Sequence, residues 1–177
     1  MTPEEICKLL EGRFGDAVTD TVLGGGHPHA VIKADGWLEV ARFLRDEPSL
    51  GFNFLNCITG LDLLEEDKLA CVYDFSRLPI DCGEDLVTET HLFAVRVVTE
   101  RSSPSIPSVA SLWATADWHE REIYDLFGVD FPGHPDMRRI LCPDDWEGHP
   151  LRKDYAYPME YHGIPGTTEY ELPNPRH

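Results

Sequence analysis

Apolar positions follow a helical period in two segments near the start of the chain. In the first, Ile6, Leu9 and Leu10 lie three and four positions apart. The run from Thr2 to Glu5 precedes them, with Thr as N-cap, Pro at the first helical position and Glu at the third, which is typical of a capping box. The second places apolar residues at i, i+3, i+4 and i+7: Trp37, Val40, Ala41 and Leu44. Both patterns predict amphipathic helices.

Five segments rich in β-branched and apolar residues are predicted as strands, and they cover residues 16–23, 29–34, 52–64, 69–76 and 89–98. The last alternates well, with His91, Phe93, Val95 and Val97 facing one side. An acidic turn, Glu65 to Asp67, predicts an exposed hairpin between the third and fourth strands. Pro79 to Asp85 is predicted as a loop.

The chain from Ser108 to Phe127 is predicted to be helical, and Gly128 is well placed to end that helix. The order of elements predicts an α+β fold of two layers, with the helices on one face of a mixed or antiparallel sheet. We expect this core domain to span residues 1–128. We expect residues 159–177, rich in Pro and Gly, to form an extended tail.

Residues 129–158 have neither helical nor strand period, although prolines and glycines punctuate them throughout. A loop of this length is uncommon in a compact domain unless it has a function. Its arginines and Trp146 are residue types enriched at binding hot spots, and its prolines lower the entropy lost on docking. These features predict that residues 129–158 form an irregular segment that docks against another protein. The alternative is an ordinary structured loop.

Charge excludes several partners. The chain has 32 acidic and 15 basic residues and a net charge of −17, which argues against nucleic acid and against direct adhesion to anionic lipid. Residues 131–154 hold five acids and four bases, so they are nearly neutral. No apolar run is long enough to span a membrane, and the acidic N-terminus does not resemble a signal peptide. We therefore expect a cytosolic or peripheral protein.

The chain has only weak sequence motifs for a catalytic, metal or cofactor site of its own. The cysteines are odd in number and widely spaced, which predicts reduced apolar side chains and no iron–sulfur site. Gly24 to Gly26 lacks a nucleotide-binding pattern, and no nucleophile elbow is present. Two minor alternatives remain open. A metal could be held by His119, His134, His149, His162 and Cys142. Acid–base chemistry could use Glu120, Glu122, Asp125 or the pair Asp144-Asp145, although the helical acids are predicted as a charged helix face with an Arg121–Asp125 pairing.

Three consecutive stretches resemble the C subunit of the proton-pumping NADH:quinone oxidoreductase, respiratory complex I, which is the 30-kDa subunit family. They are EREIYDLFGV from Glu120, FPGHPDMRRIL from Phe131 and PDDWEGHPLRKDY from Pro143. The run from Pro107 to Trp118 agrees with the same family. Two departures occur near the end: Ala156 follows Tyr155 where the family often has Pro, and many members have a longer C-terminal extension.

The resemblance implies a cofactor-free structural subunit of the peripheral arm, on the cytoplasmic face of the cell membrane. Its expected partners are the D subunit, which carries the quinone site, and neighbouring iron–sulfur subunits, while FMN, the clusters, NADH and quinone belong to the assembled complex. The alternatives are the equivalent subunit of a membrane-bound hydrogenase or related dehydrogenase, and a stand-alone metal-dependent hydrolase using His134 and His149. The residues expected to shape the loop or meet a partner are Glu120, Arg121, Asp125, Gly128, His134, Arg138, Arg139, Trp146, His149, Arg152, Lys153 and Asp154.

Overall fold

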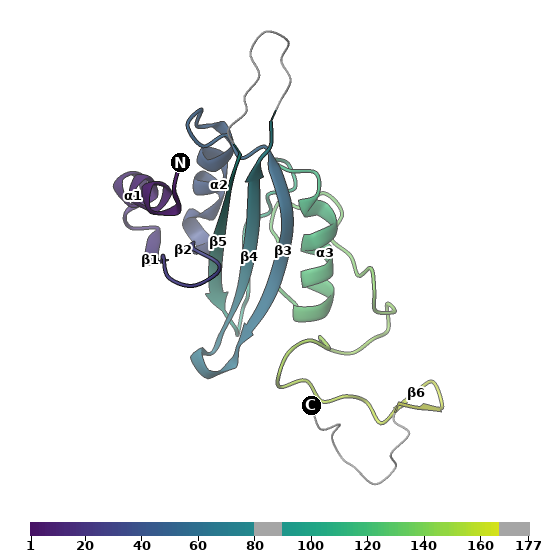
Figure 1. Cartoon of the computed structure of the whole chain (residues 1–177). Coiled ribbons are helices and arrows are strands. Elements are labelled where there is room, and N and C mark those ends of the chain that lie inside the picture. Colours follow the sequence, from purple (N-terminus) through teal and green to yellow (C-terminus); the bar gives the residue numbers. More distant parts are fainter. Residues whose placement is uncertain (80–89, 167–177) are drawn as a thin grey trace.

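A computed structural model describes residues 1–79 and 90–166 of the chain. Its helices and strands are α1 (Pro3–Phe14), β1 (Val18–Val22), β2 (His29–Lys33), α2 (Trp37–Asp46), β3 (Phe54–Leu63), β4 (Lys68–Arg77), β5 (His91–Glu100), α3 (Ala116–Phe127), β6 (Glu160–Tyr161) and β7 (Ile164–Pro165). The five longer strands form one sheet in the order β1-β2-β5-β4-β3 (Figure 1). Because β2 and β5 pair in parallel and the other neighbours are antiparallel, the sheet is mixed.

Local signals place the first two helices as predicted. At the start of α1, Thr2 Oγ1 accepts a hydrogen bond from the Glu5 backbone N–H (3.3 Å), and Glu5 Oε2 accepts one from the Thr2 N–H (2.8 Å). This capping box satisfies two otherwise unpaired groups at the helix start. The four apolar residues of the α2 stripe are fully buried, so the predicted face is the one that packs.

All three main helices cover the same face of the sheet. Strand register brings Phe75, Tyr73 and their neighbours on β5 to one side, where α2 contributes Trp37 and the chain before α3 contributes Trp113. The ring centroids of Trp37 and Tyr73 lie 4.4 Å apart, and those of Phe75 and Trp113 lie 4.8 Å apart. The prediction of a two-layer α+β fold is confirmed.

The predicted start of the last helix is wrong, because α3 begins at Ala116 and not at Ser108. Residues 108–115 form turns whose polar groups have tertiary partners. The Trp113 indole N–H donates to the Phe52 carbonyl oxygen (3.0 Å), and the Val109 backbone N–H donates to the Glu120 carboxylate (2.8 Å). These contacts outweigh the local tendency to continue a helix.

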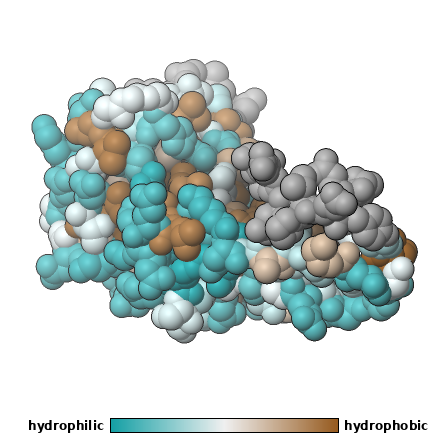
Figure 2. Space-filling view, turned by 90° about the horizontal axis from the view of Figure 1, so that it is seen from below, coloured by the Kyte–Doolittle hydropathy of each residue, from teal (hydrophilic) through white to brown (hydrophobic). Residues whose placement is uncertain are grey.

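Beyond α3 the chain leaves the sheet and extends to the lower right in Figure 1. Seen from below, this part projects beside the core and carries mostly polar residues (Figure 2). Within residues 159–177, β6 and β7 form a short hairpin, where His162 and Gly163 both adopt positive φ, as a tight two-residue turn requires. Most of the predicted Pro79–Asp85 loop lies outside the described residues, as does Cys82.

Candidate functional site

The carboxylate of Asp125, near the end of α3, organises the segment that follows the core. It is fully buried. Its Oδ2 accepts the backbone N–H groups of Ile140 (3.0 Å), Leu141 (2.7 Å) and Cys142 (2.9 Å), and its Oδ1 accepts Arg139 Nη1 (2.8 Å). Four donors thus converge on one carboxylate, and the loop bends around it.

These donors determine the charge of Asp125. Burial alone would raise the pKa of the carboxyl group, but the backbone N–H groups of residues 140–142 and the Arg139 guanidinium lower it below its usual range. Asp125 is therefore ionised at neutral pH, and the strong charge-assisted bonds are available to hold the loop.

The same segment completes the end of α3. The last carbonyl groups of a helix have no partner within it, and here three of them accept from residues 149–152: Asp125 from His149 Nδ1 (3.0 Å), Leu126 from the Leu151 N–H (3.1 Å) and Phe127 from Arg152 Nε (2.6 Å). The positive charge of Arg152 also suits the negative end of the helix dipole.

Gly128 ends α3 in the left-handed conformation, with φ of +71°. A Cβ added there would lie 2.4 Å from His149 Nε2. The glycine therefore serves both the turn and the close approach of the imidazole. The prediction that Gly128 terminates the helix is confirmed.

A second anchor joins the segment to the sheet. The Arg101 guanidinium bonds both oxygens of Asp62, at the end of β3, and also bonds Asp154. The Lys153 backbone N–H donates to Asp62 Oδ2 (2.7 Å). Burial opposes ionisation of Asp62, but the bonds from Arg101 and Lys153 lower its pKa. Residues 153–154 are thereby tied to the core.

A third polar cluster surrounds the start of the loop. The His134 imidazole is buried, and its Nδ1 accepts the Asp136 N–H (3.0 Å), so its proton lies on Nε2 and is donated to the Asp117 carbonyl oxygen (3.1 Å). Arg121 Nε lies 2.9 Å from Asp117 Oδ1, and the guanidinium stacks 4.2 Å from the centroid of the Trp118 ring. His134, in the sequence Gly133-His134-Pro135, therefore fixes the shape of the loop.

Glu120 is buried under the sheet, and no cationic side chain of residues 1–79 and 90–166 pairs with it. Its Oε2 accepts the Ser108 hydroxyl (2.6 Å) and its Oε1 accepts the Val109 N–H (2.8 Å). Burial raises the pKa of Glu120 to about 7, since desolvation outweighs these two bonds. The group can thus change protonation near neutral pH.

This predicts a stability profile that depends on pH. Because the pKa of Glu120 rises from 4.5 to about 7 on folding, the native state retains a proton that the unfolded chain releases in that interval. The stabilising contribution is complete below pH 4.5 and is lost as pH rises through 7, on the order of 3 kcal/mol. We expect Glu120→Gln to flatten the profile and to exceed the parent in free energy of unfolding at about pH 8. Denaturant titrations at several pH values test this. If the free energy of unfolding of Glu120→Gln falls with pH as steeply as that of the parent, the prediction is contradicted.

Several sequence predictions are corrected by these contacts. The acids of α3 do not form a solvated charged face, because Glu120 and Asp125 are fully buried and Arg121 is 4% exposed. The predicted Arg121–Asp125 pairing is wrong, since Arg121 pairs with Asp117 and Asp125 with Arg139. Asp144 and Asp145 are exposed and do not form a buried acidic pair.

Three of the four histidines proposed as metal ligands have separate partners. His134 bonds the Asp117 backbone, His149 the Asp125 backbone and His162 the exposed Asp145 carboxylate. In residues 1–79 and 90–166, no three His, Cys, Asp or Glu side chains are placed to hold a metal ion.

Sequence reasoning missed Asp62, Arg101 and Ser108. A signal for Asp62 was present, because it continues the strand alternation of Ile58 and Gly60 and therefore falls on the covered face of β3. A carboxylate at a position of that kind requires a buried partner. Arg101 directly follows β5 and carried no comparable signal.

The family model described as respiratory-chain NADH dehydrogenase, 30 Kd subunit, matches residues 30–161. This range includes Asp62 and Asp125 and the anchored segment, residues 139–154, that they hold. The chain belongs to this family. The resemblance drawn from the EREIYDLFGV, FPGHPDMRRIL and PDDWEGHPLRKDY stretches is confirmed.

Relatives in the 30-kDa family are named as the C subunit of NADH-quinone oxidoreductase. One from Chlorobium phaeobacteroides is 48% identical over 140 residues, covering 78% of this chain and 80% of the relative. One from Chloroherpeton thalassium is 44% identical over 147 residues, covering 82% of this chain. The match spans 58% of the length of the Chloroherpeton protein. The hydrogenase and stand-alone hydrolase alternatives find no support among these relatives.

Solved structures agree with the family. The trypsin-resistant fragment (1–134) of Nqo5 superimposes with a TM-score of 0.60 at 33% identity, covering 76% of this chain and 99% of the fragment. A chain of the membrane-bound sulfane sulfur reductase, an archaeal respiratory membrane complex, has a TM-score of 0.63 at 24% identity, which shows a shared fold. No helix among the described residues of the present chain has the length and apolar character of a membrane span.

Proposed function

We propose that this chain is a structural subunit in the peripheral arm of an NADH:quinone oxidoreductase, where residues 129–158 dock against the quinone-site subunit of the complex and against neighbouring iron–sulfur subunits. The complex couples NADH oxidation and quinone reduction to proton translocation, and this chain lies at the cytoplasmic face of the membrane through its partners. The observation that carries the proposal is the anchoring of residues 139–154 to the core by Asp125 and Asp62.

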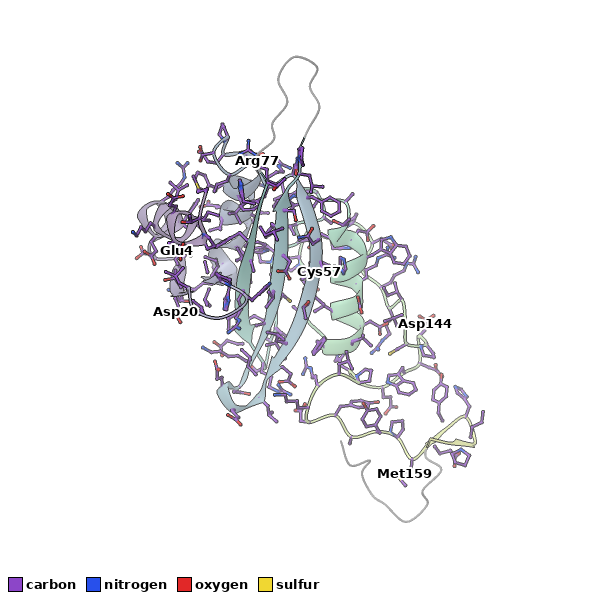
Figure 3. The ribbon with its side chains drawn as sticks, in the orientation of Figure 1. Glu4, Asp20, Cys57, Arg77, Asp144 and Met159 are labelled. Atoms are coloured by element: carbon purple, nitrogen blue, oxygen red, sulfur yellow. The ribbon has the colours of Figure 1, made fainter. Side chains whose placement is uncertain are left out.

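The anchored segment has an inner and an outer side. Arg139, His149 and Arg152 bond the end of α3 on the inner side, while two large apolar side chains face water: Leu141 is 61% exposed and Leu151 is 50% exposed. Farther along, Met159 and Ile164 are 56% and 68% exposed. Side chains of this kind, held on a preordered backbone, suit a protein interface because less entropy is lost on docking. Figure 3 marks Asp144 and Met159 on this part of the chain.

We further propose that the chain holds no redox group of its own, so that FMN, clusters, NADH and quinone bind to other subunits. Supporting this, the described cysteines do not pair and none lies in a C-x-x-C motif. The buried rings of His134 and His149 are already bonded to the backbone of α3. These groups serve the shape of the segment.

Affinity purification of the tagged chain from detergent-solubilised membranes of its own host tests the proposed function. We expect recovery of the quinone-site subunit together with the flavin- and cluster-bearing subunits, and with NADH:quinone activity. Recovery of the chain alone, from the soluble fraction, would contradict the proposal.

Variants of two adjacent arginines can distinguish a role in docking from a role in the shape of the loop. The Arg138 side chain is 63% exposed and pairs with the exposed Asp136, whereas Arg139 is 17% exposed and bonds Asp125 and the Gly148 carbonyl oxygen. We expect Arg138→Ala to leave the free energy of unfolding within about 0.5 kcal/mol, because exposed ion pairs contribute little. The same variant should recover about tenfold less of the quinone-site subunit. Arg139→Ala should lower both quantities. If Arg138→Ala and the parent recover equal amounts of that partner, Arg138 is excluded from the interface.

A further inference from the structure

The sheet face opposite the helices, called here the open face, carries one arginine among valines. Strand register aligns Val31 of β2, Arg96 of β5, Val72 of β4 and Thr59 of β3 in a row across this face. In Figure 1 no helix crosses in front of β3, β4 and β5. The next row along β5 adds Val98. The centre of the open face thus carries valines around Arg96, with Thr59 at the end of the row and Asp74, paired with His27, in the row on the other side.

A groove of about 500 Å³ lies over this region. Its lining includes Val31, Val98, Leu63, Arg96, Lys33 and Lys68. Three exposed carboxylates, Asp20, Glu66 and Glu100, also contribute to it. Figure 3 places Asp20, at one end of this groove, on the opposite side of the molecule from Asp144 and Met159. The other end, at Leu63 and Glu100, adjoins Asp62 and Arg101, which hold residues 153–154.

Arg96 is the unusual residue of the groove. Its Nε has no exposed surface and no hydrogen-bond partner in the part of the chain that the structure describes. No carboxylate of the described residues lies within ion-pair distance of its guanidinium, nor of Lys33 or Lys68. The buried Nε itself cannot be reached by a ligand, but Arg96 as a whole is half-buried, and a guanidinium without an ion-pair partner is matched best by a carboxylate. The missing acceptor therefore points to a ligand.

The surroundings of Arg96 favour a protein ligand. The three acids and three bases that line the groove cancel in formal charge, so it offers no excess positive charge to hold a multiply charged polyphosphate or a layer of anionic lipid headgroups. Half-buried valines beside an arginine are typical of the centre of an interface, and the charged residues around them are typical of its polar rim. A peptide segment can supply both a single carboxylate and apolar contacts.

We infer that the open face binds a segment of a second subunit of the complex, which places an Asp or Glu carboxylate against Arg96 and apolar side chains against Val31, Val72 and Val98. This inference rests on the proposed function. It adds a second contact surface, so that the chain is held on two sides of its core.

Thiol labelling of the complex tests whether the open face is covered. Thr59→Cys lies in the Arg96 row and is exposed, while Gly12→Cys, on the outer side of α1, has open space for a side chain. With the label located by peptide mass spectrometry, residue 59 should react in the isolated chain and be protected in the assembled complex. Residue 12 should react in both. Equal labelling of residue 59 in both states would overturn the inference.

Charge exchange tests the carboxylate. We expect Arg96→Glu to lower the recovered amount of partner subunits by about tenfold or more. The amount recovered with Arg96→Lys should lie between those of Arg96→Glu and the parent. The control Lys8→Glu makes the same change on exposed α1 and should recover the parental amount. A photo-crosslinker at residue 59 identifies the partner segment, and replacing its acidic residue by Arg should restore recovery with Arg96→Glu.

Other outcomes would overturn the inference while leaving the proposed function intact. These are parental recovery with Arg96→Glu, a crosslink to lipid or to a second copy of this chain, and a partner segment without an acidic residue. If the parental chain itself recovers no other subunit, the proposed function fails first. Circular dichroism of Arg96→Glu confirms that the variant is folded before recovery is compared.

Discussion

Replacing Asp125 with Asn should release residues 139–152 from the end of α3 and abolish assembly. The buried carboxylate accepts three backbone N–H groups and the Arg139 guanidinium. An amide cannot accept all four, and its own NH₂ group would oppose one of the donors. We expect a loss of about 3 kcal/mol in the free energy of unfolding, because a buried guanidinium and buried N–H groups lose their acceptor.

Three measurements check this expectation: denaturant unfolding, limited proteolysis of residues 139–152, and recovery of the quinone-site subunit on the tagged chain. The matched control is Asp144→Asn, which makes the same chemical change on an exposed residue of the same segment. It should behave as the parent in all three. If Asp125→Asn resists proteolysis as the parent does, Asp125 does not hold the segment.

Replacing Arg101 with Met should destabilise the core as strongly. The substitution keeps much of the side-chain volume but leaves the Asp62 carboxylate, which is 7% exposed, without its guanidinium. Removing one partner of a buried ion pair costs about 3–5 kcal/mol, because the other charge remains buried. The same variant frees Asp154 and should expose residues 153–154 to proteases.

The comparison variant for Arg101 is Arg45→Met, which removes an ion pair with exposed Asp46. That loss should stay within about 0.5 kcal/mol. The double variant Arg101→Met with Asp62→Leu should regain part of the stability, since no buried charge remains, although the Lys153 N–H then lacks its acceptor. An Arg101→Met chain as stable as the parent would refute the role assigned to the Asp62 anchor.

The fold could be predicted wherever a signal was local. The capping box of Thr2 and Glu5 and the apolar stripe of α2 depend on residues a few positions apart, and the structure confirms both. Strand alternation gave the buried side of β5, but it carries no information on pairing partners. The order β1-β2-β5-β4-β3 therefore could not be derived from the strand patterns. The turns of residues 108–115 could not be predicted, because their partners Phe52 and Glu120 lie 61 and 11 positions away in the sequence from Trp113 and Val109.

The sequence predicted which residues belong to the candidate site better than it predicted what each of them does. Asp125, Gly128, Arg139, His149 and Arg152 were all named, and they meet at the end of α3. The sequence could not separate Arg138 from Arg139, because neighbouring arginines in an irregular segment have no period that distinguishes inside from outside. Their directions follow from Asp125, whose buried charge attracts only one of them.

The proposed function makes this chain a structural subunit without which the oxidoreductase does not assemble. The most direct test deletes its gene and compares native gels and NADH:quinone activity of the membranes before and after the parental chain is restored. We expect loss of the full-size complex and of its activity, with both returning on restoration. A full-size, fully active complex in membranes that lack the chain would contradict it.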